Sequence, residues 1–172
     1  TIKQVLTAED IENLSVDQIN QIIEKEFHYD DYKWQKDNNI LITEKYRAEG
    51  LHKILYKCPH CMAESKMVSS GATLKCPDCG IEYHLNENGT LSCVNGEAKF
   101  THIPDWFEWE REQVKFEIEN GTYYFEDSVD VHSMPRTNKF EPLGGGKLTH
   151  DIENGFVLEG FYRGQNYRIQ RE

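Results

Sequence analysis

Cys58-Pro59-His60-Cys61 and Cys76-Pro77-Asp78-Cys79 are the two stretches that decide the fold of this chain. Each is a Cys-Pro-x-Cys pair, and the intervening segment is residues 62–75. This is the ligand spacing of one tetrahedral metal ion held by four thiolates, usually Zn²⁺. Gly80 follows the last cysteine, where a tight turn needs unusual backbone angles. The sequence therefore predicts a zinc ribbon with the ligands Cys58, Cys61, Cys76 and Cys79.

Four cysteines close the coordination shell, whereas a catalytic zinc keeps one position open for water. The pattern therefore favours a structural zinc over thiol redox chemistry, an iron site or a catalytic metal. Three further residues stay open as additional or replacement ligands. Cys93, the fifth cysteine, is either an idle thiol or a spare ligand, and His60 and His84 either replace a cysteine or lie on the ribbon surface.

The composition excludes several classes of partner. The 172 residues carry a net charge of −11, which opposes binding to nucleic acid or docking on anionic lipid. Paired cysteines in an otherwise cysteine-poor chain are typical of a reducing cytoplasm and of metal binding. No run approaches the ~20 apolar residues of a membrane span, and no signal-peptide core is present. We therefore expect a cytoplasmic protein without a direct membrane span or a nucleic-acid partner.

Helices are expected before and after the ribbon. Residues 7–27 show apolar residues at helical spacing around a capping box formed by Ser15 and Gln18. Residues 30–35 are expected to add a turn, and residues 47–56 a short helix or an extended lead-in. A further amphipathic helix is expected from Pro104 to about Asn120, with Asp105 as its N-cap, with Trp106, Trp109 and Phe116 on its apolar side, and with a left-handed cap at Gly121.

Strand patterns fill the rest of the chain. Within the ribbon we expect short strands at 67–68 and 72–74 around a turn at 69–71, and a hairpin over 86–89. After the last helix, strands are expected at 123–131, 147–150, 156–162 and 167–170, with residues 144–146 as a flexible turn and further turns at Asn154-Gly155 and Gly164. A sheet this small has exposed edges, so it either belongs to a larger β domain or pairs with a partner.

These elements predict an α+β fold: N-terminal helices, a four-cysteine zinc ribbon, one amphipathic helix, and a small antiparallel β-sheet or partial barrel. The expected division is a helical connector at 1–56, the ribbon at 57–101, and a helix with an antiparallel β region at 102–172, which we expect to be truncated.

Few stretches offer catalytic chemistry. His28 with Asp30 or Asp31 has the composition of a base and its orienting carboxylate, although a histidine at a helix C-terminus explains it more simply. The glycines of Gly144-Gly145-Gly146-Lys147 lack the spacing of a phosphate-binding loop, and neither Gly-x-Ser-x-Gly nor His-Glu-x-x-His occurs. No catalytic or cofactor-binding residue is therefore predicted.

Four stretches together resemble the region that follows the catalytic domain in bacterial 1-acyl-sn-glycerol-3-phosphate acyltransferases. They are His28-Tyr29-Asp30-Asp31-Tyr32-Lys33-Trp34-Gln35, Arg47-Ala48-Glu49-Gly50-Leu51-His52, Leu55-Tyr56-Lys57-Cys58-Pro59-His60-Cys61 and His102-Ile103-Pro104-Asp105-Trp106. Enzymes of that family transfer an acyl group from a thioester to lysophosphatidic acid, using a histidine and an aspartate five positions later. The resemblance covers nearly the whole chain.

The histidine–aspartate motif of that family is absent here. Five positions after the seven histidines stand Lys33, Lys57, Ser65, Gly89, Phe107, Thr137 and Gly155. The resemblance thus implies a catalytically silent accessory fragment whose partner is the missing acyltransferase domain of the same protein, and which reaches a membrane only through that parent protein. An acidic surface suits packing better than recruitment of an acidic acyl-carrier protein. A stand-alone zinc-ribbon interaction module is the alternative.

Overall fold

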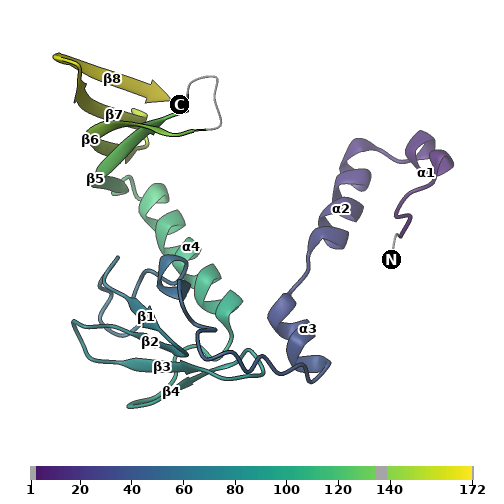
Figure 1. Cartoon of the computed structure of the whole chain (residues 1–172). Helices are drawn as coiled ribbons and strands as arrows, with labels where there is room; N and C mark the ends of the chain where they lie inside the picture. The colour runs from purple at the N-terminus through teal and green to yellow at the C-terminus, as the bar shows by residue number, and fades with distance from the viewer. Residues whose placement is uncertain (1–2, 135–138, 172) are drawn as a thin grey trace. The chain divides into compact units, whose positions relative to one another are not determined.

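The computed structural model describes residues 3–134 and 139–171 and has an α+β fold, as predicted (Figure 1). The described residues form four α-helices, one 3₁₀ turn and two four-stranded antiparallel sheets. The chain divides into two compact units, Thr1–Glu108 and Trp109–Glu172, and each is described by itself. This boundary lies inside the last helix, and the three-part division expected from the sequence stays a prediction.

The N-terminal region 7–27 forms two helices where one helical region was expected. These are α1 (Ala8–Asn13) and α2 (Val16–Phe27), and Leu14 between them is extended. The predicted capping box is confirmed, since Ser15 Oγ accepts from the backbone N–H of Gln18 while the Gln18 side chain accepts from the Ser15 N–H. α1 ends at Asn13 with the extended Leu14 as its C-cap, and the extended backbone of the N-cap Ser15 then starts a separate helix.

The segment leading to the ribbon has less helix than the sequence suggested in one place and more in another. The turn expected at 30–35 is the helix α3 (Asp31–Asp37). The helix considered for 47–56 is reduced to the 3₁₀ turn η1 (Leu51–Lys53), which begins after Gly50 in a left-handed conformation (φ 84°).

The ribbon contains one meander, β1 (Val68–Ser70), β2 (Thr73–Lys75), β3 (Glu82–Leu85) and β4 (Leu91–Cys93), in that spatial order. The turn expected at 69–71 is displaced. Ser69 and Ser70 belong to β1 and pair with Leu74 and Thr73 of β2, and the chain reverses direction at Gly71, which has φ 61°. The hairpin over 86–89 is confirmed by the bond from the Asn86 N–H to the Thr90 carbonyl, 2.8 Å.

The core of the first unit combines ribbon strands with the last helix. Its fully buried large side chains include Leu55, Leu74, Tyr83, Leu91 and Trp106. The Tyr83 and Trp106 ring centroids lie 5.1 Å apart, within the range of favourable aromatic pairs. The ribbon alone has little apolar surface to bury, so the helix that carries Trp106 supplies its largest core side chain.

That helix, α4 (Ile103–Glu119), begins two residues before Asp105. The prediction of Asp105 as N-cap was therefore wrong, and Asp105 lies in the first turn, where a carboxylate still complements the helix dipole. Trp106 is buried as predicted, but Phe116 is 66% exposed. The predicted cap is confirmed at Gly121, which has φ 67° and donates to the Ile118 carbonyl.

The second unit contains a meander of four strands: β5 (Tyr124–Ser133), β6 (Glu141–Asp151), β7 (Gly155–Tyr162) and β8 (Gln165–Arg171). The expected turn at 144–146 was wrong, because these glycines lie inside β6 and pair with β5. The register shifts between Val131 and His132, opposite Gly144, whose φ of 102° accommodates the irregularity. Turns at Gly155 and Gly164 are confirmed by their positive φ angles.

Close packing by neighbouring strands explains why position 146 of β6 is occupied by glycine. A Cβ at this position would lie 2.8 Å from Val131 Cγ2 and 2.9 Å from the Glu159 carbonyl oxygen. We expect Gly146→Ala to destabilise the second unit by roughly 1–3 kcal/mol, the usual cost of overpacking. Thermal unfolding followed by circular dichroism measures this change.

Gly145 supplies the matched control, because a Cβ there meets no atom within 4 Å. Gly145→Ala is expected to leave the unfolding midpoint unchanged or slightly raised, since alanine restricts the unfolded chain. Equal midpoints for the two variants would contradict the packing assigned to Gly146.

Candidate metal centre

The four predicted cysteines converge at one point. Their sulfur atoms all lie within 4.8 Å of one another, with Cys58 Sγ 3.7 Å from Cys79 Sγ and Cys61 Sγ 3.6 Å from Cys76 Sγ. A disulfide needs about 2.05 Å, and all of these thiols are free. Four sulfurs at about 2.3 Å from a tetrahedral ion would lie about 3.8 Å apart. The arrangement is therefore the size of a tetrahedral thiolate site.

Both Cys-Pro-x-Cys turns, hereafter knuckle 1 (58–63) and knuckle 2 (76–81), have the same backbone hydrogen bonds. In knuckle 1, the Met62 N–H donates to the Cys58 carbonyl and the Cys58 N–H to the Ala63 carbonyl, both at 2.9 Å. In knuckle 2, the corresponding bonds run from Gly80 to Cys76, 2.8 Å, and from Cys76 to Ile81, 3.0 Å. Local backbone bonding thus shapes each half of the site independently of the other half.

The residue after the second cysteine of each knuckle is left-handed, with φ 64° at Met62 and 77° at Gly80. This conformation costs a residue with a Cβ roughly 1–2 kcal/mol more than glycine. Gly80→Ala is therefore expected to destabilise the first unit by about 1 kcal/mol, although a Cβ there meets no atom within 4 Å. Met62→Gly is expected to be neutral or stabilising. Urea unfolding of the two variants checks both signs, and destabilisation by Met62→Gly would contradict the strain at that position.

Burial divides the four thiols into two pairs, with Cys58 and Cys76 buried and Cys61 and Cys79 exposed. Cys58 and Cys76 are buried, and burial raises the pKa of the Cys58 thiol to about 12 and also raises that of the Cys76 thiol. Cys61 is exposed, and the Ala63 backbone N–H lowers its pKa. A bound cation removes the proton from a coordinating thiol outright. Two buried thiols that resist ionisation on their own thus fit a site whose charge is supplied by a metal.

The other ligand candidates are engaged elsewhere. His60 Nε2 lies 2.8 Å from the hydroxyl of Tyr83, and His84 Nε2 accepts from the Arg47 guanidinium at 3.0 Å. Cys93 ends β4 and is not part of the sulfur cluster. Among residues 3–134 and 139–171, the four cysteines are the one group of three or more histidine, cysteine or acidic side chains arranged for metal binding.

Contacts that the sequence did not reveal surround knuckle 1. The Trp106 indole N–H donates to the Lys57 carbonyl at 3.1 Å, and Lys99 Nζ donates to the Pro59 carbonyl at 2.6 Å. The Lys99 backbone N–H donates to the Tyr83 hydroxyl at 3.1 Å. Nothing in the local sequence marks Lys99 for this role, whereas an aromatic residue soon after the last cysteine was a usable signal for Tyr83.

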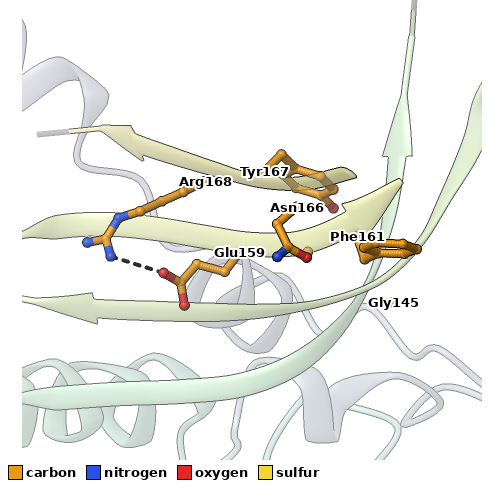
Figure 2. Close-up of a pocket in the computed structure, with 7 residues that line it drawn as sticks. Gly145, Glu159, Phe161, Asn166, Tyr167 and Arg168 are labelled. Carbon is orange, nitrogen blue, oxygen red and sulfur yellow. Dashed lines mark hydrogen bonds and ion pairs between the residues drawn. The ribbon is translucent and has the colours of Figure 1, made fainter. Parts of the chain in front are cut away.

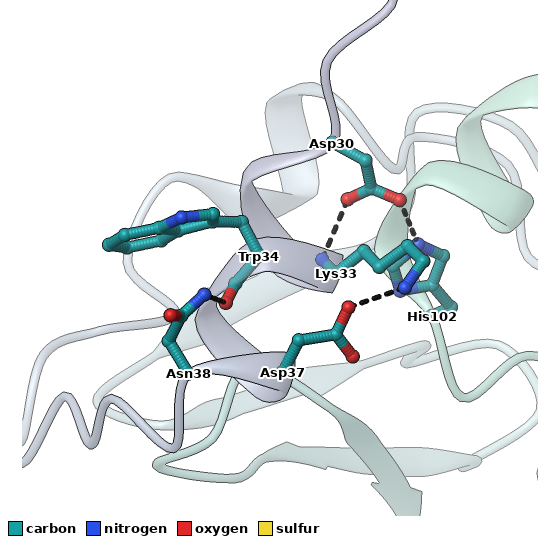
Figure 3. Close-up of polar contacts among 6 residues, drawn as sticks. All are labelled: Asp30, Lys33, Trp34, Asp37, Asn38 and His102. Carbon is teal, nitrogen blue, oxygen red and sulfur yellow. Dashed lines mark hydrogen bonds and ion pairs between the residues drawn. The ribbon is translucent and has the colours of Figure 1, made fainter. Parts of the chain in front are cut away.

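The carboxylate of Asp30 is occupied by contacts that maintain the fold (Figure 3). It caps α3 by accepting from the Lys33 N–H at 2.8 Å, and it lies 2.7 Å from His102 Nε2. Burial by itself would raise the pKa of Asp30, but these two bonds, the attraction of His102 and a further bond from the Tyr32 N–H together outweigh burial and lower that pKa. In the described part of the chain, no hydrogen bond joins the His28 side chain to Asp30 or Asp31. The hypothetical base and its orienting carboxylate are thus not assembled.

The second unit has a hollow of about 610 Å³ on its sheet (Figure 2). Its lining includes Gly145, Phe161, Tyr167 and an ion pair of 3.0 Å between Arg168 and Glu159. The ion pair neutralises both of its charges, and none of the described residues that line the hollow is a cysteine, serine or histidine. These described residues therefore present no such nucleophile with an adjacent base.

Comparisons with protein-family models, with curated proteins and with solved structures found no match for this chain. In the part of the chain that the structure describes, no helix has both the length and the apolar character needed to cross a bilayer.

Proposed function

We propose that the four-cysteine centre holds one structural Zn²⁺ and that the chain is a non-catalytic accessory unit. The observation that carries this proposal is the convergence of four sulfur atoms within 4.8 Å of one another. Four thiolates leave no open coordination position for water or substrate, which distinguishes a structural zinc from a catalytic one. Tetrahedral sulfur ligation also suits iron, so metal analysis is the direct test.

A structural ion has a physical purpose in this unit. The sheet β1–β4 has strands of only three or four residues, and its hydrogen bonds alone cannot offset the entropy of ordering the strands and the segments that connect them. Zinc binding to four cysteines releases on the order of 10 kcal/mol and is coupled to folding. The ion would therefore supply much of the stability that the small apolar core lacks.

We further propose that this unit belongs to a 1-acyl-sn-glycerol-3-phosphate acyltransferase and packs against its catalytic domain. Two observations support the proposal. Four stretches resemble that family, and in the structure these stretches all contribute to the first unit. Asp30 contacts His102, the Arg47 guanidinium donates to the Leu85 carbonyl at 2.6 Å, and Trp106 donates to Lys57. Residues that carry the resemblance thus hold the ribbon together, as expected for a structural part of such an enzyme.

A stand-alone interaction module is the second candidate, and the second unit favours it. Among the described residues of 109–172, Val157 is the one apolar residue that is buried. Phe125, Phe156, Phe161 and Ile169 are exposed. Among the strands of the described residues, none neighbours the outer edge of β5 or of β8. Apolar side chains and open strand edges are features of surfaces that pair with another chain.

Elemental analysis of the purified chain tests the zinc proposal. We expect one zinc per chain and no iron after purification without added metal. One iron per chain would reject the structural zinc. So would an unfolding midpoint that stays the same after dialysis against a chelator has removed the metal.

The reading frame of the gene separates the two functional candidates. The acyltransferase proposal requires an upstream domain with a histidine followed five positions later by an aspartate. The full-length protein should transfer an acyl group from a thioester donor to lysophosphatidic acid, and the present chain alone should not. A reading frame without such a domain would leave the interaction module as the function.

A further inference from the structure

The segment 99–106, which includes the start of α4, is hydrogen-bonded to the backbone on both sides of Cys58. Trp106 is fully buried, and its indole N–H donates at 3.1 Å to the carbonyl of Lys57, the residue immediately before Cys58. Lys99 Nζ donates at 2.6 Å to the carbonyl of Pro59, the residue immediately after Cys58. Two donors from the segment 99–106 thus bind carbonyl groups on either side of Cys58, so the position of this segment depends on the position of knuckle 1.

A side-chain relay on β3 reinforces this connection. The buried Tyr83 hydroxyl accepts from the Lys99 N–H at 3.1 Å and lies 2.8 Å from His60 Nε2, within knuckle 1. The Tyr83 ring packs 5.1 Å from that of Trp106. Every step of the connection lies within the first unit, so it forms one contiguous network from the sulfur cluster to α4.

We propose that metal occupancy of the four-cysteine centre controls the order of α4 at residues 103–108. The proposal rests on the proposed zinc site and deepens it. A bound ion joins knuckle 1 to knuckle 2 and so holds the Lys57 and Pro59 carbonyls in place. Without the ion, knuckle 1 keeps its own backbone hydrogen bonds but is no longer joined to knuckle 2, so these acceptors lose their fixed position relative to the ribbon. The buried indole N–H then has no aligned acceptor, which disfavours the docked helix.

Because of thermodynamic linkage, this coupling is also measurable by weakening the docking of α4 and measuring the change in zinc affinity. If the metal stabilises the docked helix, then the docked helix must strengthen metal binding by the same factor. Removing the indole donor with Trp106→Phe keeps an aromatic ring in the core but deletes the bond to Lys57. One hydrogen bond makes only a modest net contribution to the free energy of the folded state, so zinc affinity should fall roughly 3- to 10-fold.

The experiment combines hydrogen–deuterium exchange with a zinc competition assay on the full chain. In the zinc-loaded protein, backbone amides at 106–110 should be protected, and chelation should accelerate their exchange at least tenfold. Chelation risks unfolding the whole first unit, so Trp106→Phe is studied with zinc bound. It should retain one zinc per chain, bind it more weakly, and exchange faster at 106–110 than the wild type.

Leu91→Val is the matched control, because Leu91 is buried in the same core on β4 and makes no bond to either knuckle. It should leave zinc affinity unchanged. Equal zinc affinities for Trp106→Phe, Leu91→Val and the wild type would overturn the coupling while leaving the structural zinc intact. An equal loss of affinity in Leu91→Val and Trp106→Phe would also overturn it, by assigning the effect to general packing. A wild-type chain that binds no zinc would instead reject the proposed site itself.

Discussion

Replacing Cys76 by serine is expected to abolish stoichiometric zinc binding and to destabilise the first unit by several kcal/mol. Cys76 is buried, and its sulfur lies 3.6 Å from that of Cys61. A serine hydroxyl does not ionise at neutral pH, so the ion would lose one of four anionic ligands. Because zinc binding contributes on the order of 10 kcal/mol to the folding of small zinc domains, loss of one ligand removes a large part of that term.

The measurement is metal content together with urea unfolding followed by tryptophan fluorescence. Cys93→Ser is the matched control, since Cys93 is half-buried on β4 and lies outside the sulfur cluster. It should retain one zinc and nearly wild-type stability. A Cys76→Ser chain that keeps its zinc and its unfolding midpoint would show that the cluster does not hold a structural ion.

Replacing Trp106 by alanine is expected to cost about 3–5 kcal/mol, the usual range for removing a large aromatic side chain from a core. Trp106 is 0% exposed, packs against the rings of Tyr83 and Phe100, and donates to the Lys57 carbonyl. The variant therefore creates a cavity and also leaves a buried carbonyl without this donor. Such a cost is comparable to the whole stability of a small unit.

Urea unfolding monitored by far-UV circular dichroism measures this loss without relying on the removed fluorophore. Trp34→Ala is the control, because Trp34 lies on α3 and is 46% exposed. Its effect should stay below about 1 kcal/mol, as for most surface substitutions. Similar losses for both tryptophans would contradict the central position of Trp106 in the core.

Local signals predicted the helix and turn chemistry of this chain well. The capping box of Ser15 and Gln18 and the left-handed cap at Gly121 are confirmed because each depends on residues within one turn. Asp105 failed as an N-cap, since the helix starts at Ile103 and already buries Ile103 and Trp106. Burial on one face therefore set the start of α4, ahead of the preference of a single acidic residue.

The glycines of β6 show where local reasoning fails in a sheet. Residues 144–146 have the composition of a flexible turn, but Gly146 is needed for close approach to Val131 and Glu159, and Gly144 lies at a register shift. A glycine that permits a turn is indistinguishable in sequence from one that permits backbone contact. Only the partner strand decides between them.

The sequence by itself determined the four-cysteine cluster, because the chemistry of cysteine and the two-residue spacing within each knuckle are local properties. Cys58, Cys61, Cys76 and Cys79 converge as their pattern predicted. Tertiary structure alone decided what surrounds them. Trp106 bonds Lys57 across 49 positions, and His102 contacts Asp30 across 72. Such pairs carry no local signature, since they follow from which apolar faces are buried together and which polar groups must then be satisfied.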